Sequence, residues 1–525
     1  MAVSGTTPHH SPMAAHRFAW AAAIVMAGTV LSRLLGLVRQ QVLAIEFGTT
    51  PRMDAFWTAF KIPDAIFTLV AGGVLSSSLI PVFAGYLSHH QRAQAVHVAS
   101  AIITTVLAVL GGAALLLELL APELVPLLTS TYSPDRQALV VALTRVLLIQ
   151  PIFLAVSGVM MGILQSYQHF LLPALAPVVY NLSIIAAALL LGPNLGVEGL
   201  AIGVVAGAVL QVALQYPAMR HFQFRYRPLI DLKDEGVREV LRLMFPRVFA
   251  SASLATNFLV SAALASALQK GAYTGFNIAF SLMQLPLGIF AIAISVVAFP
   301  TLSAQVAQND LGSMSRTLLR SLRFILFLVI PSTVGLVLLR EPIVRTLFQY
   351  GAFTARSTAL TTQPLIFFAL GLFGHATVEI VLRGFYALHE TLRPVLINVV
   401  TLALNLGLSF AFVGSLAQGG LALAMSIAVG LEALALLALL STRLPGFDWM
   451  ALIGGALRCL VAALAMGLAL YAFVHGSTAR LDLQSVGPRA AQLAGGLGVA
   501  GVVYLGAAYL LRVPEVGDLR RLVRR

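Results

Sequence analysis

The chain has 525 residues, of which 59% are hydrophobic and only 10% are charged, and its mean hydropathy is +0.92. A soluble domain carries about 25% charged residues. The composition therefore excludes a soluble protein and indicates one that crosses a membrane several times. The single cysteine, Cys459, excludes a disulfide framework and a cysteine-based metal cluster.

Apolar stretches follow one another along the whole chain, and each is long enough for a membrane helix at roughly 20 residues per span. The sequence therefore predicts an all-α polytopic membrane protein with 14 transmembrane helices. The first apolar run is long enough to remain as a span, so no cleavable signal peptide is expected. The predicted spans lie near residues 19–45, 54–86, 93–120, 137–164, 171–192, 197–218, 243–268, 272–304, 316–339, 362–387, 392–414, 418–441, 451–475 and 488–511.

The net charge of +13 comes from basic residues spread over short loops, not from one patch of the kind that binds nucleic acid. With the N-terminus in the cytoplasm, the cytoplasmic loops hold 20 Lys and Arg residues and the outer loops hold 8. Lys and Arg favour the cytoplasmic side of a membrane protein. The asymmetry therefore predicts that both termini are cytoplasmic.

The two halves of the chain resemble each other. Pro173 and Pro394 each open an apolar helix, and Gly-Leu-Ala at 199–201 recurs at 420–422 with the same offset. Six spans return the chain to its starting side, so we expect two six-helix lobes related by a pseudo-two-fold axis along the membrane normal, with a central site between them. The expected parts are a cytoplasmic N-terminal tail (1–18), an N-lobe (19–218), a cytoplasmic amphipathic linker (219–242), a C-lobe (243–441), helices 13 and 14 (442–511) and a basic cytoplasmic tail (512–525).

The segment from Arg220 to Arg247 mixes basic and acidic residues. This pattern is typical of an amphipathic surface helix on an anionic leaflet. A plain solvated linker has the same composition, and the sequence leaves both interpretations open.

Ionisable residues interrupt the first two predicted spans. A charged side chain at membrane depth costs about 2.5–3.5 kcal/mol on insertion scales, so it normally faces a cavity or a partner. Arginine binds phosphate bidentately and lysine binds it as a point charge. We therefore predict an anion site formed by Arg33, Arg39 and Lys61. The alternatives are structural: Lys61 pairs with Asp64 or Asp54, and Arg33 with a helix carbonyl.

Two carboxylates have separate interpretations. Asp54 lies near the outer end of the second span, where it is either a gate residue or the N-cap of its own helix. Glu379, on the tenth span, either binds a coupling proton or sodium ion or is a structural partner of Arg383. The chain contains no P-loop, HExxH or GxSxG motif and no cluster of His with carboxylates of metal-site spacing. We therefore expect a transporter without cofactor or metal, not an enzyme.

Several motifs in these spans are specific in spacing. The first two spans carry Ser32-Arg33-Leu34-Leu35-Gly36 with Arg39, and then Asp54-Ala55-Phe56 and Phe60-Lys61-Ile62-Pro63. With these motifs, and over essentially its whole length, the chain resembles the lipid II flippases of bacterial cell-wall synthesis (the MurJ or MviN family). This family lies within the superfamily of multidrug, oligosaccharidyl-lipid and polysaccharide exporters. The resemblance implies a central cavity that contains Arg33, Arg39 and Lys61, an outer gate that contains Asp54, and a lipid-tail groove formed by helices 13 and 14.

The resemblance also implies a function. A member of this family would move an undecaprenyl-pyrophosphate-linked peptidoglycan precursor from the inner to the outer leaflet of the bacterial cytoplasmic membrane by alternating access. Its partners would be that lipid and proteins of cell-wall synthesis or division. The chain departs from the family's pattern at Phe67, Thr68 and Ser281, where members often carry charged residues.

Two other interpretations stay open at this point, and a third is excluded. One is an exporter of another polyprenyl-linked glycan, or a multidrug antiporter of the same superfamily. A polytopic glycosyltransferase would need acidic residues in sizeable outer loops, which the sequence lacks. A scaffold without transport activity is the last.

Overall fold

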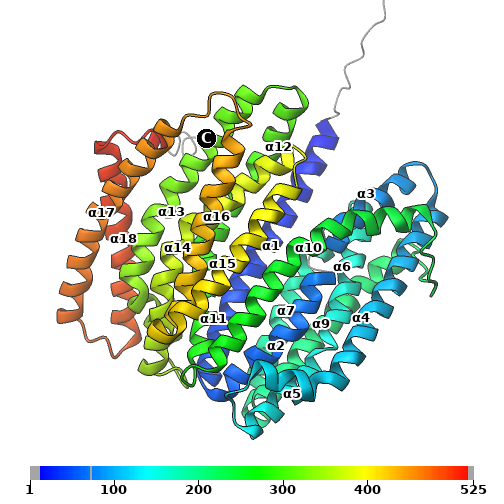
Figure 1. The fold of residues 1–525 in the computed structure, drawn as a ribbon, viewed down its shortest axis with the longest axis horizontal. Helices are drawn as coiled ribbons and strands as arrows, with labels where there is room; N and C mark the ends of the chain where they lie inside the picture. Colours follow the sequence, from blue (N-terminus) through cyan, green and yellow to red (C-terminus); the bar gives the residue numbers. More distant parts are fainter. Residues whose placement is uncertain (1–11, 71–73, 518–525) are drawn as a thin grey trace, which may run out of the picture. The chain divides into compact units, whose positions relative to one another are not determined.

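The computed structural model describes residues 12–70 and 74–517, and every regular element in these two ranges is a helix (Figure 1). Within the described residues, 11 helices are long and apolar enough to cross a membrane. All fourteen predicted spans fall on helices. The predicted fold class, an all-α multi-span membrane protein, is confirmed.

The first compact unit consists of Met1–Leu43, Thr58–Pro126 and Gln137–Ala255. Its core is an apolar cluster of side chains from the third, fourth, sixth, ninth and tenth helices. Small residues allow close packing, because a Cβ on Gly203 would lie only 2.2 Å from the Cβ of Ala187 on a neighbouring helix. The helices that contribute to this unit are α1 (Pro12–Phe47), α2 (Pro51–Val70), α3 (Val74–Ser88), α4 (Arg92–Leu128), α5 (Pro134–Leu147), α6 (Gln150–Ser166), α7 (Leu171–Leu190), α8 (Gly192–Leu195), α9 (Val197–His221) and α10 (Glu235–Ser266).

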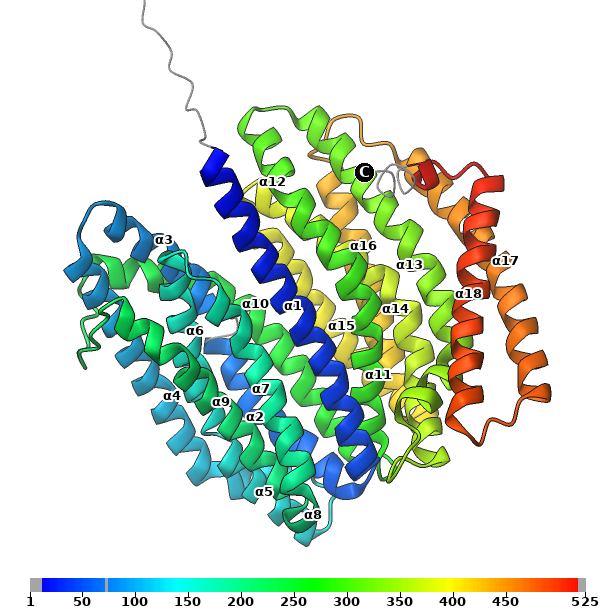
Figure 2. The same ribbon diagram turned by 180° about the vertical axis from the view of Figure 1, so that it is seen from behind.

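The second compact unit consists of Ala44–Trp57, Leu127–Arg136 and Thr256–Arg525. Its own helices are α11 (Ala272–Pro286), the π-helix η1 (Leu287–Ile292), α12 (Ala293–Ala307), α13 (Leu311–Phe348), α14 (Ala355–Ala387), α15 (Leu392–Leu416), α16 (Gln418–Ser441), α17 (Trp449–Arg480) and α18 (Val486–Leu510). Helix α14 packs against α11, α13 and α16. Figure 2 shows α17 and α18 as a hairpin that packs against α13.

The predicted span over residues 54–86 corresponds to two described helices. Helix α2 ends at Val70 and α3 begins at Val74. Residues 71–73, between the two helices, lie outside the described part of the chain. Pro63 lies inside α2.

Two further predicted spans contain irregular turns. The span near 272–304 is one apolar helical stretch from Ala272 to Ala307, and η1 interrupts its α-helical pattern directly after Pro286. The ring nitrogen of proline cannot donate a hydrogen bond to the preceding turn, and a π-turn is one way in which a helix accommodates such a defect. The span near 137–164 consists of α5 and α6.

The connection between α9 and α10 is not a surface helix. Residues 222–234 are not helical, and α10 begins at Glu235. The chain turns at Gln223, where φ is +51°, and then crosses α4. The N–H of Arg227 donates to Ser100 Oγ of α4 over 3.3 Å. The helical interpretation was therefore wrong over residues 222–234, because side chains of α4 provide hydrogen bonds that compete with a helix there.

Candidate functional site

Asp54, in the first turn of α2, has a carboxylate that is almost fully buried, with 3% of the residue exposed. Its Oδ2 accepts a hydrogen bond from the N–H of Gly271 over 2.6 Å. Its Oδ1 accepts from both the N–H and the hydroxyl of Thr274, over 2.9 and 2.6 Å. The carboxylate therefore caps the N-terminus of α11, although it belongs to another helix. The N-cap of α2 is provided by Thr50, whose Oγ1 accepts from the N–H of Met53 over 3.3 Å.

The start of α11 suits a carboxylate. The first N–H groups of a helix have no partner within the helix, and this end carries a partial positive charge. Gly271, the residue before α11, has φ of +90°, a conformation that side chains other than glycine rarely adopt. A Cβ at this position would also lie 2.3 Å from the carbonyl oxygen of Thr49. Glycine is therefore needed here for Asp54 to reach the helix end.

Arg136 provides the positive partner of this carboxylate. Its Nη2 lies 3.3 Å from Asp54 Oδ2, and its side chain is only 15% exposed. The guanidinium carbon also lies 3.4 Å from the centre of the Tyr132 ring, which places the cation over the ring face. Three segments of the second unit, 44–57, 127–136 and the start of α11, thus meet at one ion pair. We call Asp54, Arg136, Gly271 and Thr274 the Asp54 clamp.

Further hydrogen bonds fix the chain that leads into α2. The N–H of Ala352 donates to the carbonyl oxygen of Ile45 over 2.8 Å. The hydroxyl of Thr49 donates to Ser357 Oγ over 2.8 Å. The turn between α1 and α2 is therefore attached both to α11 and to the segment between α13 and α14.

A second polar cluster, in the first unit, contains two of the three predicted cations. Arg39 of α1 interacts electrostatically with Tyr180 of α7, and so does Asp64 of α2. Lys61, one turn before Asp64, interacts with the Asp64 carboxylate. The Tyr180 hydroxyl accepts a hydrogen bond from Gln150 Nε2 of α6 over 3.0 Å. We call these five side chains the Tyr180 cluster.

The Arg39 guanidinium in this cluster has one donor that no described residue satisfies. Arg39 is partly buried, and its Nε is enclosed with no hydrogen-bond partner among the described residues. Such a donor costs free energy unless something accepts from it. The pairing of Lys61 with Asp64, one of the structural alternatives, is present as an electrostatic interaction.

Arg33 is placed differently from Arg39. It lies on α1 about a turn and a half before Arg39, and its side chain is exposed. The adjacent carbonyl of Ser32 accepts a hydrogen bond from Asn181 Nδ2 of α7 over 3.4 Å. This contact holds the Arg33 turn of α1 against α7.

Glu379 lies on α14, one turn after His375, and both side chains are partly buried. His375 Nε2 is enclosed without a hydrogen-bond partner among the described residues. Arg383, which the sequence suggested as a partner for Glu379, has its guanidinium carbon 5.9 Å from the centre of the Phe299 ring.

Sequence reasoning missed Tyr180, Gln150 and Arg136. Tyr180 and Gln150 are polar tips within apolar helices, a pattern that also occurs where such a tip serves packing alone. Arg136 entered the sequence analysis only as one of the eight basic residues of the outer loops. Its partner Asp54 is 82 residues away in the sequence, and no local pattern connects the two.

Comparison with known proteins decides the family. The sequence model described as Lipid II flippase MurJ matches residues 43–489. The chain belongs to this family. The lipid II flippase MurJ of Burkholderia cenocepacia is 31% identical over 419 residues, which cover 78% of this chain and 81% of the relative. The probable lipid II flippase MurJ of Rhizobium meliloti is 29% identical over 514 residues, which cover 96% of each.

Solved structures agree with the MurJ fold. A lipid II flippase MurJ in an inward closed conformation aligns with a TM-score of 0.79 at 23% identity, covering 93% of this chain and 99% of that one. An inward-facing multidrug transporter of the MATE family aligns with a TM-score of 0.66 at 14% identity, covering 80% of this chain and 98% of that one. MurJ proteins are flippases, so the chain is a membrane transporter and not an enzyme, and it is a multi-span protein of the bacterial inner membrane.

The departures from the MurJ pattern provide no charge in this structure. Phe67 packs against the apolar core of the first unit. The hydroxyl of Ser281 donates to the carbonyl oxygen of Asn277 in its own helix over 2.9 Å. The candidate cations for an anionic substrate are therefore the arginines and the lysine of α1 and α2.

Proposed function

We propose that this chain carries lipid II from the inner to the outer leaflet of the cytoplasmic membrane by alternating access. The observation that supports this most directly is the Tyr180 cluster, in which α1 and α2 contribute the cations Arg39 and Lys61 and Arg39 Nε has no acceptor among the described residues. Cations are rarely kept at membrane depth without an anionic partner or cargo. The pyrophosphate of a polyprenyl-linked precursor is such a cargo.

In this proposal the two cations have different roles. Arg39 provides a planar fork that can hold two phosphate oxygens, and Lys61 provides a compact charge. Asp64 neutralises part of Lys61 while the site is empty, so the bound pyrophosphate would compete with Asp64. Arg33, which is exposed on the same helix, adds attraction for the arriving anion. No bond of the substrate is broken.

The Asp54 clamp acts as the outer gate in this proposal. Its hydrogen bonds attach the turn between α1 and α2 to the start of α11, so access from the outside would require Asp54 to release Gly271 and Thr274. The membrane potential, negative inside, favours outward movement of an anion by about 2.3 kcal/mol per charge per 100 mV. That gain is comparable with the net free energy of two or three hydrogen bonds.

The lipid tail, the partner proteins, the chain termini and Glu379 also have places in this proposal. The prenyl chain would stay in the lipid along α17 and α18. Proteins of cell-wall synthesis or division would be partners, and both termini would be cytoplasmic. Glu379 would couple an ion to transport, and Glu379→Gln with transport unchanged would contradict that role.

The experiment that tests the function is complementation of a flippase-depleted bacterium. Wild-type chain should restore growth, whereas Arg39→Ala, Lys61→Ala and Arg33→Ala should fail at equal membrane levels. Arg52→Ala, which removes an exposed arginine from the first turn of the same α2 helix, is the matched control and should restore growth. Growth with all three cavity variants would contradict the anion site.

A second candidate is export of another polyprenyl-linked glycan. The observation that favours it is the uncharged environment at Phe67 and Ser281, where the family often carries charge. Failure of the wild-type chain to complement, together with full membrane insertion, would favour this candidate.

A further inference from the structure

A pocket of about 530 Å³ lies where the linker between α9 and α10 crosses the start of α4. Three arginines line it: Arg92 from the first turn of α4, and Arg225 and Arg227 from the linker. Gln94, His97 and Gln223 add polar groups between them. None of these residues belongs to the Asp54 clamp or the Tyr180 cluster.

The walls of this pocket are held in place by hydrogen bonds, and the Arg225 and Arg227 side chains are exposed at its rim. The linker N–H groups of Arg227 and Leu229 donate to Ser100 Oγ and Thr104 Oγ1 of α4, each over 3.3 Å. Arg92 also donates from its Nη2 to the carbonyl oxygen of Phe222. The arginine pocket is therefore formed by the attachment of the linker to α4.

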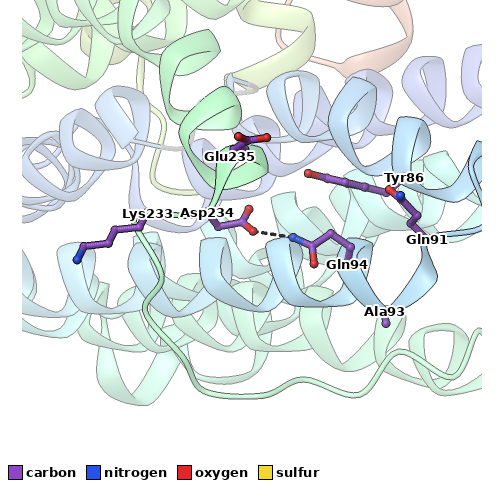
Figure 3. A pocket seen from close by; sticks show the side chains of 7 residues that line it. All are labelled: Tyr86, Gln91, Ala93, Gln94, Lys233, Asp234 and Glu235. Carbon is purple, nitrogen blue, oxygen red and sulfur yellow. Dashed lines mark hydrogen bonds between the residues drawn. The ribbon is translucent and has the colours of Figure 1, made fainter.

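Acidic groups lie beside the pocket but are already engaged. Asp231 Oδ2 lies 3.1 Å from His97 Nε2. Asp234 Oδ2 accepts from Gln94 Nε2 over 2.6 Å, and Asp234 faces a neighbouring hollow with Tyr86 and Glu235 (Figure 3). No carboxylate is among the described residues that line the arginine pocket. The described lining of the arginine pocket therefore contributes three arginines and no carboxylate.

The pocket has the chemistry of a phosphate site. Arginine forks match phosphate oxygens, and the first turn of α4 directs the positive end of its helix dipole toward the pocket. The same linker exposes apolar side chains: Tyr226 is 43%, Ile230 60% and Leu232 50% exposed. Aromatic and aliphatic groups beside arginines are typical of a segment at a membrane surface.

We propose that this pocket binds the phosphodiester headgroup of an anionic membrane lipid. The arginines hold the phosphate, while Tyr226, Ile230 and Leu232 contact the acyl region. The lipid would strengthen the attachment of the linker to α4, because it bridges Arg92 of the helix and Arg225 and Arg227 of the linker. This site is independent of the transported substrate.

The test uses the full chain in nanodiscs of phosphatidylcholine with a varied fraction of phosphatidylglycerol, and measures lipid retention by native mass spectrometry. Arg225→Gln with Arg227→Gln should weaken phosphatidylglycerol binding about tenfold or more, since two charge-assisted contacts are lost. The matched control, Arg220→Gln with Arg242→Gln, removes two exposed basic residues outside the pocket and should retain the lipid. Equal losses in both double variants would overturn the proposal, because net charge alone would then explain them.

Two further arms separate the remaining explanations. Excess inorganic phosphate should not displace the lipid, because phosphate lacks the apolar contacts. Displacement of the lipid by phosphate at the same concentration as the lipid would assign the pocket to soluble phosphate and overturn the lipid assignment. Arg225→Lys with Arg227→Lys keeps the charge but loses both forks, so it should bind with intermediate strength even if the glutamine variant fails to fold. Wild-type binding by the lysine variant would overturn the role of the arginine forks.

Discussion

Asp54 and Thr274 are 220 residues apart in the sequence, yet one carboxylate oxygen of Asp54 accepts both the N–H and the hydroxyl of Thr274. The same carboxylate reaches Gly271 with its other oxygen. The N-terminus of α11 is thus capped by a side chain of α2. These hydrogen bonds stabilise the contact between the start of α2 and the start of α11, and they must break if the two helix ends separate.

Asp54→Ala should destabilise the closed arrangement. It leaves the start of α11 uncapped, which costs about 0.5–2 kcal/mol, and it leaves Arg136 without its carboxylate in a mostly buried position. We expect a lower melting temperature and loss of transport in reconstituted vesicles. Asp54→Asn keeps an acceptor for the helix end but loses the charge, so its effect should be smaller. A melting temperature for Asp54→Ala equal to wild type would contradict the cap.

Thr274→Val tests the hydroxyl alone. Valine keeps the shape of threonine but cannot donate to Asp54 Oδ1, and a typical hydrogen bond of this kind contributes about 1 kcal/mol, more when the acceptor is charged. We expect a modest fall in melting temperature. Thr274→Ser retains the donor and is the control, so it should stay closer to wild type. Equal effects of valine and serine would assign the loss to packing.

Gly271→Ala should be more damaging than the same change at another glycine with positive φ. The backbone at Gly271 has φ of +90°, and a Cβ would lie 2.3 Å from the carbonyl oxygen of Thr49. Gly446 has φ of +67° with nothing within 4 Å of its Cβ position. Gly446→Ala therefore adds only backbone strain of about 1–2 kcal/mol. Comparable folded yields and melting temperatures for both variants would show that the turn at Gly271 can relax.

The sequence predicted the features that are local in origin. The apolar stretches predicted the helices, and charges inside them indicated Arg39, Lys61 and Asp54. The same local reasoning could not choose between a surface helix and a solvated linker at residues 222–234. There the decisive interactions are hydrogen bonds to Ser100 and Thr104, more than 120 residues away.

The partners of the candidate residues were also beyond local reasoning. The sequence left Asp54 open between a gate residue and the N-cap of its own helix. Its real role depends on Gly271 and Thr274, whose position is set by the packing of the whole second unit. Tyr180 and Gln150 carry no signal in the sequence that separates them from ordinary polar tips in apolar helices.

The attachment of the linker to α4 should depend on pH only in acid. The hydrogen bond from His97, with backbone N–H groups, lowers the pKa of Asp231 from its usual value of 3.8. A carboxyl whose folded pKa is depressed stabilises the folded state fully above its unfolded pKa, and this contribution is lost as the pH falls through the lower folded value. The linker should therefore stay docked at neutral pH and loosen only below about pH 4.

Asp231→Asn should bring that loosening to neutral pH. Hydrogen exchange at the linker amides of Arg227 and Leu229 is the measurement, because these amides donate to α4. The variant at neutral pH should show the low protection factors that wild type shows in acid, once each rate is divided by the intrinsic exchange rate at its own pH. Linker protection that is the same in both chains at neutral pH would mean that Ser100 and Thr104 hold the linker without Asp231.

Tyr180→Phe tests whether the Tyr180 cluster positions Arg39 for an anion. The change removes the hydroxyl that accepts from Gln150 and interacts with Arg39, and it leaves the ring in place. We expect affinity for lipid II to fall several-fold, with a melting temperature close to wild type. Arg39→Lys, which keeps the charge but loses the fork, should weaken binding about tenfold. If Tyr180 acts by orienting the guanidinium, the double variant should lose little more than Arg39→Lys alone, because the two changes then remove the same interaction. Losses that add in full would show that Tyr180 contributes to binding independently of Arg39.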